Sequence, residues 1–182
     1  KKDGTVTAIQ GRQLSDGGAF ASTQEFMVAV GINTLVGIVK SDNIDYTNSV
    51  VVTNKTASGA YRGFGYLEST ALLTPVLDMA MEKVSIDPVE FYKKNVLKAG
   101  DMFYEGYGSD DFLMNAGPDM PLVVEEGAKK FNWSKRWKGW GVPTTVSGSK
   151  RRGVGIGVSG HTDCGEQNSN CIVQLNAFGS AT

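Results

Sequence analysis

Apolar residues recur at helical spacing in the middle of the chain. Over residues 67–84 they fall on one helical face, at Leu73, Val76, Leu77, Ala80, Met81 and Val84. This spacing predicts an amphipathic helix whose apolar face belongs to the core. Asp87 then stands as an N-cap, with Pro88 at the first helical position and Glu90 three residues after the cap. A second helix is therefore predicted from Asp87 to Gly100 at the latest. Its side chains expected to face the core are Val89, Tyr92 and Val96.

The other apolar segments predict shorter elements. Residues 44–53 are rich in β-branched side chains, which is typical of a strand. Residues 26–39 are apolar but contain glycines and β-branched residues, so helix and strand compete, and we favour a helix. Residues 5–9 follow an Asp-Gly turn and predict the second strand of a hairpin. Residues 101–118 show little periodicity and predict a loop, after which Pro121 opens another helix.

Both ends of the sequence suggest an internal fragment of a longer chain. The strand expected at residues 5–9 lacks the partner that would precede it, and residues 171–176 alternate like a strand whose partner would follow. The glycine-, proline- and serine-rich stretch before Gly153 predicts a boundary. We expect part of one domain in residues 1–140, a linker in residues 141–152 and the start of a second domain in residues 153–182.

Composition and charge exclude several classes of function. A hydrophobic fraction of 41% with 20% charged residues is typical of a globular chain, and no apolar run approaches the length of a membrane span. A net charge of −1 gives no overall field to attract nucleic acid, so no such partner is expected. Cys164, Cys171 and His161 match no metal template, so we expect no metal site made of side chains alone, and free thiols in the cytoplasm.

Two glycine motifs are candidate sites. Residues 155–160 formally match a dinucleotide fingerprint, but neither a helical pattern nor a suitably spaced acidic residue follows, which favours a closely packed strand. Residues 60–65 combine Arg62 and Phe64 with two glycines, directly before the strongest helix. Unpaired N–H groups and the positive end of the helix can hold an anionic group there. The alternative is a surface loop with a salt-bridged arginine and a core phenylalanine.

The same residues carry a family resemblance. Residues 58–65 (SGAYRGFG), the long helix and residues 87–101 (DPVEFYKKNVLKAGD) resemble, in order and spacing, the molybdopterin-binding subunit of the xanthine dehydrogenase and aldehyde oxidase family. Residues 2–8 and 152–157 are similar to further segments of that subunit. The resemblance covers nearly the whole chain. It implies an α+β fold with mixed sheets and packed helices, from the molybdopterin-binding domains of a molybdenum hydroxylase.

The resemblance also implies a function. Family members transfer a water-derived oxygen to an aromatic or aldehyde-type carbon, or remove it reductively, at molybdenum or tungsten on a pterin that can be extended to a dinucleotide. The expected partners are the rest of the molybdopterin subunit, an iron–sulfur subunit with [2Fe–2S] clusters, a FAD subunit and a small-molecule substrate. A hydratase-like member and a reductive member acting on an aryl thioester also remain open. The competing hypothesis is a non-catalytic α+β binding or scaffold domain.

Site residues follow from matching this sequence to the family motif. Arg62 matches an arginine beside the cofactor, and the main chain around the cofactor is matched by Ala60, Tyr61 and Gly63. Phe64 matches an aromatic residue that packs on a flat substrate. The family's substrate funnel aligns with a later stretch, so substrate neighbours are expected at His161, Thr162, Cys164 and Glu166. The catalytic base, a glutamate in this family, is expected outside these residues.

Overall fold

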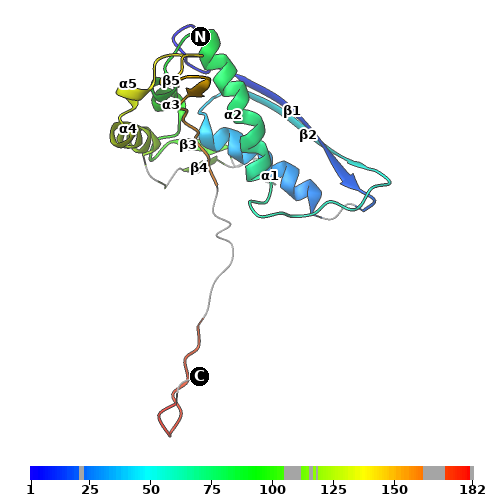
Figure 1. The fold of residues 1–182 in the computed structure, drawn as a ribbon. Coiled ribbons are helices and arrows are strands. Elements are labelled where there is room, and N and C mark those ends of the chain that lie inside the picture. Colours follow the sequence, from blue (N-terminus) through cyan, green and yellow to red (C-terminus); the bar gives the residue numbers. More distant parts are fainter. Residues whose placement is uncertain (21–22, 105–111, 115–116, 118, 162–170, 181–182) are drawn as a thin grey trace.

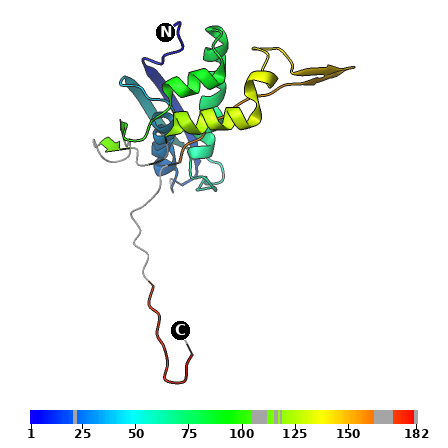
Figure 2. The same cartoon turned by 90° about the vertical axis from the view of Figure 1, so that its left-hand side faces the viewer.

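The computed structural model describes residues 1–20, 23–104, 112–114, 117, 119–161 and 171–180. Helices pack on one another and beside a long strand pair, while residues 171–180 lie away from this body (Figures 1 and 2). Each sheet of the described part has two strands. The predicted α+β class is confirmed.

The N-terminal part is a strand–helix–strand unit. Strand β1 (Ile9–Gly18) pairs in parallel with β2 (Ile44–Val52), starting at Ile9 opposite Ile44, and α1 (Gln24–Ile38) connects them. The helix favoured for residues 26–39 is therefore confirmed. Its sequence is ambiguous because α1 is buried on most sides, so its own apolar residues are distributed around the helix and do not form a single stripe. The strand expected at residues 5–9 was misplaced, since β1 begins at Ile9.

Helices α2 (Tyr66–Lys83) and α3 (Pro88–Asn95) confirm the two strongest predictions. Asp87 caps α3, because its carboxylate accepts a hydrogen bond from the Val89 N–H at 2.7 Å. The same carboxylate accepts the indole N–H of Trp133 at 3.0 Å, which joins α3 to a distant part of the chain. The inward residues of this segment are buried as predicted: Val89, Tyr92 and Val96.

The predicted core face of α2 is only partly correct. Leu77 and Met81 are buried, but Val76 is 60% exposed. Helix α2 packs against α1 and α3 along a narrow stripe, and its outer side faces away from the body in Figure 1. The apolar face of α2 is therefore wider than the surface that its neighbours in the described chain bury.

The core lies where the ends of α1 and α2 meet α3, α4 (Met120–Phe131) and α5 (Trp133–Arg136). The helix predicted from Pro121 is thus confirmed. Buried side chains from these five helices and from the segment after residue 153 form one cluster, which includes Ile38, Met81, Tyr92, Val124, Trp133 and Val158. Because the segment after residue 153 contributes Val158 to this cluster, it packs on the body of the fold. The domain boundary before it stays a prediction.

Short strands occupy segments where the sequence predicted none. Strands β3 (Met102–Tyr104) and β4 (Phe112–Met114) pair antiparallel within the expected loop, and β5 (Thr145–Ser147) pairs with β6 (Lys150–Arg152) within the expected linker. Three residues are too few to show an alternating pattern. The strand expected at residues 171–176 is not formed; Leu175 makes an isolated bridge there and is 78% exposed. Within the described ranges, no helix combines the length and apolarity needed to cross a bilayer.

Candidate cofactor-binding site

The turn that enters α2, residues 60–65, is called the glycine loop below. Its backbone folds into two tight turns, because the Phe64 N–H donates to the Tyr61 carbonyl at 2.8 Å and the Tyr66 N–H donates to the Gly63 carbonyl at 2.9 Å. Gly63, Phe64 and Gly65 have φ values of 101°, 48° and 93°. Positive φ angles at three successive residues are costly unless glycine occupies the positions, so the backbone at Phe64 is strained.

Gly65 also holds the loop against α1. A Cβ atom at this position would overlap the carbonyl oxygen of Met27, so the backbones of the loop and α1 approach as closely as a glycine permits. The Phe64 ring adds a second contact, since it packs edge-on against Phe26 with centroids 5.1 Å apart. The glycine loop is thus fixed on α1 at both its backbone and its aromatic side chain.

Replacing Gly65 with alanine is expected to lower the free energy of unfolding by about 2–4 kcal/mol, because it combines left-handed strain with the overlap at Met27. Urea denaturation measures this change. Gly59→Ala is the matched control, since a Cβ there meets no atom within 4 Å and its φ is ordinary. Equal stability of the two variants would contradict the close approach.

The first turn of α2 presents hydrogen-bond donors that the fold leaves unused. No side chain caps this end of the helix, and the N–H groups of Leu67 and Glu68 have no acceptor within the described part of the chain. Arg62 is exposed beside them in the loop, and Tyr61 is 70% exposed. Glu68, in the same turn, is the one nearby carboxylate of the helix end. The loop and helix end together can bind an anionic group through main-chain donors and a guanidinium.

The structure brings His161 to the same region. Its ring stacks on Tyr66, with centroids 4.1 Å apart and an angle of 26° between the planes. Ser159 supports this approach, because its hydroxyl lies 3.5 Å from the hydroxyl of Thr70 on α2. Two segments about 100 positions apart in the sequence, both expected to contribute to the site, therefore meet at the start of α2.

Residues 1–96 match the family model described as the molybdopterin cofactor-binding domain. The chain belongs to this family. The match includes the glycine loop and the whole of α2 and α3, which are the elements that carried the resemblance. The predicted membership of a molybdopterin-binding family is thus confirmed.

Relatives of this molybdopterin-binding chain match it over most of its length. It is 27% identical to the aldehyde oxidoreductase of Megalodesulfovibrio gigas, over all of the chain and 19% of the relative. It is 29% identical to a putative xanthine dehydrogenase molybdenum-binding subunit of Escherichia coli K12, over 88% of the chain and 20% of the relative. The chain therefore spans about a fifth of the length of these relatives.

A solved structure shares the fold of the molybdopterin-binding chain. The aldehyde oxidoreductase from Desulfovibrio gigas aligns with a TM-score of 0.58 and 24% identity, over 74% of this chain and 14% of that one. This likeness concerns the arrangement of helices and sheets.

The residues of the glycine loop fit an anionic cofactor such as molybdopterin. The fit rests on the unused N–H donors at the start of α2, on exposed Arg62 and on the open space around Gly59. Within the described ranges, no three His, Cys, Asp or Glu side chains gather to hold a metal ion. Main-chain N–H groups and a guanidinium suit anionic oxygens, so the loop residues would hold the organic, charged part of the cofactor.

Some of the predicted site residues lie at or beside the glycine loop, and the others fall outside the described residues. Arg62, Ala60, Tyr61 and Gly63 lie in the glycine loop, and Phe64 is half-buried against Phe26. His161 lies next to the loop through Tyr66. Thr162, Cys164 and Glu166 lie outside the described residues. All of these assignments stay predictions.

Two residues of this region were not predicted from the sequence. Tyr66 joins His161 to the loop, and Phe26 supports Phe64. Tyr66 directly follows the motif, so an aromatic residue at the first helical position was a usable signal. Phe26 had no such signal, because its contact with Phe64 depends on how α1 packs.

Proposed function

We propose that the glycine loop and the start of α2 bind the anionic part of the molybdenum cofactor in a molybdenum hydroxylase. The observation that carries this proposal is a strained, glycine-defined turn that presents Arg62 and unused N–H groups at one helix end. Backbone strain of this kind persists only where the surrounding structure enforces it, and it is concentrated at ligand-binding and active sites. Membership of the molybdopterin-binding family supplies the ligand class.

Each residue then has a stated role. Arg62 holds a negatively charged oxygen of the cofactor, and the main chain of Ala60, Tyr61 and Gly63 surrounds it. Phe64, held by Phe26, presents an aromatic surface to a flat substrate. His161, stacked on Tyr66, lies at the edge of the same region, and we place Thr162, Cys164 and Glu166 with it as substrate neighbours.

When bound, the molybdenum cofactor supplies oxygen transfer to or from an aromatic or aldehyde-type carbon. Iron–sulfur and FAD groups in other domains or subunits of a cytoplasmic complex would accept the electrons. The proton-accepting base comes from a glutamate outside these 182 residues. Relatives described as an aldehyde oxidoreductase and a xanthine dehydrogenase subunit support this class of reaction.

Metal and pterin analysis of the complete protein tests the proposal. We expect molybdenum or tungsten and pterin in equal amounts, close to one of each per chain, measured by elemental mass spectrometry and by fluorescence of the oxidised pterin. A stable protein that contains neither, even after reconstitution with cofactor, would refute the proposal in favour of a non-catalytic scaffold.

A further inference from the structure

Positive charge is concentrated in one segment of this nearly neutral chain. Residues 129–152 contain eight of the 18 lysines and arginines and no aspartate or glutamate, which leaves ten basic against 19 acidic residues elsewhere. All eight basic residues are exposed. Lys129 is bridged to Glu126, and Arg136 lies over the Phe131 ring. The segment is thus locally positive, which the net charge of the whole chain conceals.

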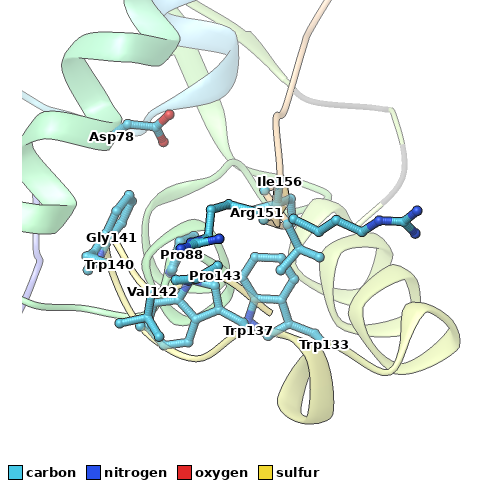
Figure 3. A pocket seen from close by; sticks show the side chains of 15 residues that line it. Asp78, Pro88, Trp133, Trp137, Trp140, Gly141, Val142, Pro143, Arg151 and Ile156 are labelled. Atoms are coloured by element: carbon cyan, nitrogen blue, oxygen red, sulfur yellow. The ribbon is translucent and has the colours of Figure 1, made fainter. Parts of the chain in front are cut away.

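The three tryptophans of the chain lie in the same segment and line one pocket (Figure 3). The pocket has a volume of about 550 Å³ and lies between α2, α3, α5 and the segment that follows β6. Figure 3 shows Asp78 on the α2 side and Trp133 and Trp137 across from it. Its lining also includes Arg151 and Arg152, and it includes no residue of the glycine loop. Its volume is in the range of small-molecule sites.

Two of the three indoles are held by the fold, and the third has a free donor. The Trp133 N–H donates to Asp87 at 3.0 Å, and the Trp140 N–H donates to the Ile86 carbonyl at 2.8 Å. Trp137 stacks on Trp133 with centroids 5.9 Å apart, but its own N–H has no acceptor within the described ranges. The pocket therefore contains a fixed aromatic wall with one indole donor available to a ligand.

Charged groups of both signs complete the lining. The Arg152 guanidinium makes no ion pair or side-chain hydrogen bond in the part of the chain that the structure describes, and the same holds for the half-buried Asp78 carboxylate. Burial raises the pKa of Asp78, as expected for a carboxylate without a partner. Arg151 is partly engaged, since its Nη1 donates to the Gly148 carbonyl at 2.7 Å.

We propose that this pocket binds a planar nitrogen heteroaromatic compound that carries a negatively charged group. The aromatic wall accepts the ring, the guanidinium of Arg152 binds the negatively charged group, and Asp78 accepts a ring or exocyclic N–H. Asp78 makes the pocket selective, because a carboxylate disfavours anions that bring no N–H donor. The proposal does not depend on the molybdenum cofactor.

Tryptophan fluorescence tests this inference directly. Adenosine 5′-monophosphate is the probe, with adenosine and inorganic phosphate as partial ligands, at about 150 mM salt to screen diffuse attraction. We expect a saturable change in fluorescence with the nucleotide, binding at least tenfold weaker with adenosine, and no saturable change with phosphate. Trp137→Phe is expected to remove most of the fluorescence change. This loss assigns the change to the pocket, even in a longer protein that contains other tryptophans.

Charge-removing variants provide the second measurement, by calorimetry. Arg152→Gln is expected to weaken nucleotide binding about tenfold, because a charge-assisted hydrogen bond is lost. Lys150→Gln is the matched control: it removes one charge from the same exposed strand but does not line the pocket, and binding should change less than twofold. Equal effects of the two variants would overturn the proposal. So would binding of inorganic phosphate as tightly as the nucleotide. Polyglutamate serves as a polyanion without a ring, and the proposal would also fail if the protein bound polyglutamate but not the nucleotide.

Discussion

Arg62→Ala in the complete protein is expected to lower turnover and pterin content about 10–100-fold, the usual effect of losing a residue that supports a bound cofactor. Stability should change by less than about 0.5 kcal/mol, because Arg62 is exposed and makes no ion pair within the described ranges. Pterin fluorescence, steady-state turnover and urea denaturation measure the three quantities. The different size of the effects follows from the proposed role of Arg62, whose exposed guanidinium would contact the cofactor and not the core.

The matched control for this variant is Arg12→Ala, which removes an exposed arginine from β1, away from the glycine loop. It should leave turnover and pterin content within twofold. If Arg62→Ala lost stability and activity in proportion, Arg62 would be a structural arginine, and the surface-loop alternative would hold.

Tyr92→Ala is expected to lower the free energy of unfolding by about 3–5 kcal/mol, the range for removing a large aromatic side chain from a core. Tyr92 is fully buried in the cluster that joins α1, α2, α3 and α4, and its ring packs edge-on against Phe91 at 5.6 Å. Its loss leaves a cavity at the point where these helices meet. Urea denaturation of the variant and the parent measures the change.

Tyr92→Phe separates the ring from the hydroxyl. The Tyr92 hydroxyl is buried and makes no hydrogen bond in the described structure, and burial, with the charge of Asp78, raises its pKa to about 12. Removing a buried hydroxyl without a partner should not destabilise the fold, and a small gain is expected. A loss comparable to that of Tyr92→Ala would show that the hydroxyl is bonded after all.

Local signals in the sequence predicted several elements correctly. Asp87 and Pro88 place the start of α3 because capping and proline geometry act over four residues. The period of apolar residues predicts α2 within one residue at each end. It overstates the core, since Val76 and Leu77 both fit the pattern, but the neighbours of α2 cover only Leu77.

The candidate site shows the same division. The glycine loop was visible because glycines, an arginine and an aromatic residue precede a strong helix. His161 was visible as a separate residue, but its stacking on Tyr66 was not, because the residues lie 95 positions apart. The Trp137 pocket was missed although the unbalanced positive charge of residues 129–152 is evident in the sequence, since net charge averages it away.

The sequence by itself determined where helices start, which turn needs glycine, and which family the loop resembles. These properties depend on backbone preferences and side chains within a few residues of one another. Only the tertiary structure decided that β1 and β2 pair in parallel, that Phe26 holds Phe64, and that one side of α2 stays exposed. Such contacts join residues far apart in the chain, and their energy depends on which surfaces pack together, which no local pattern encodes.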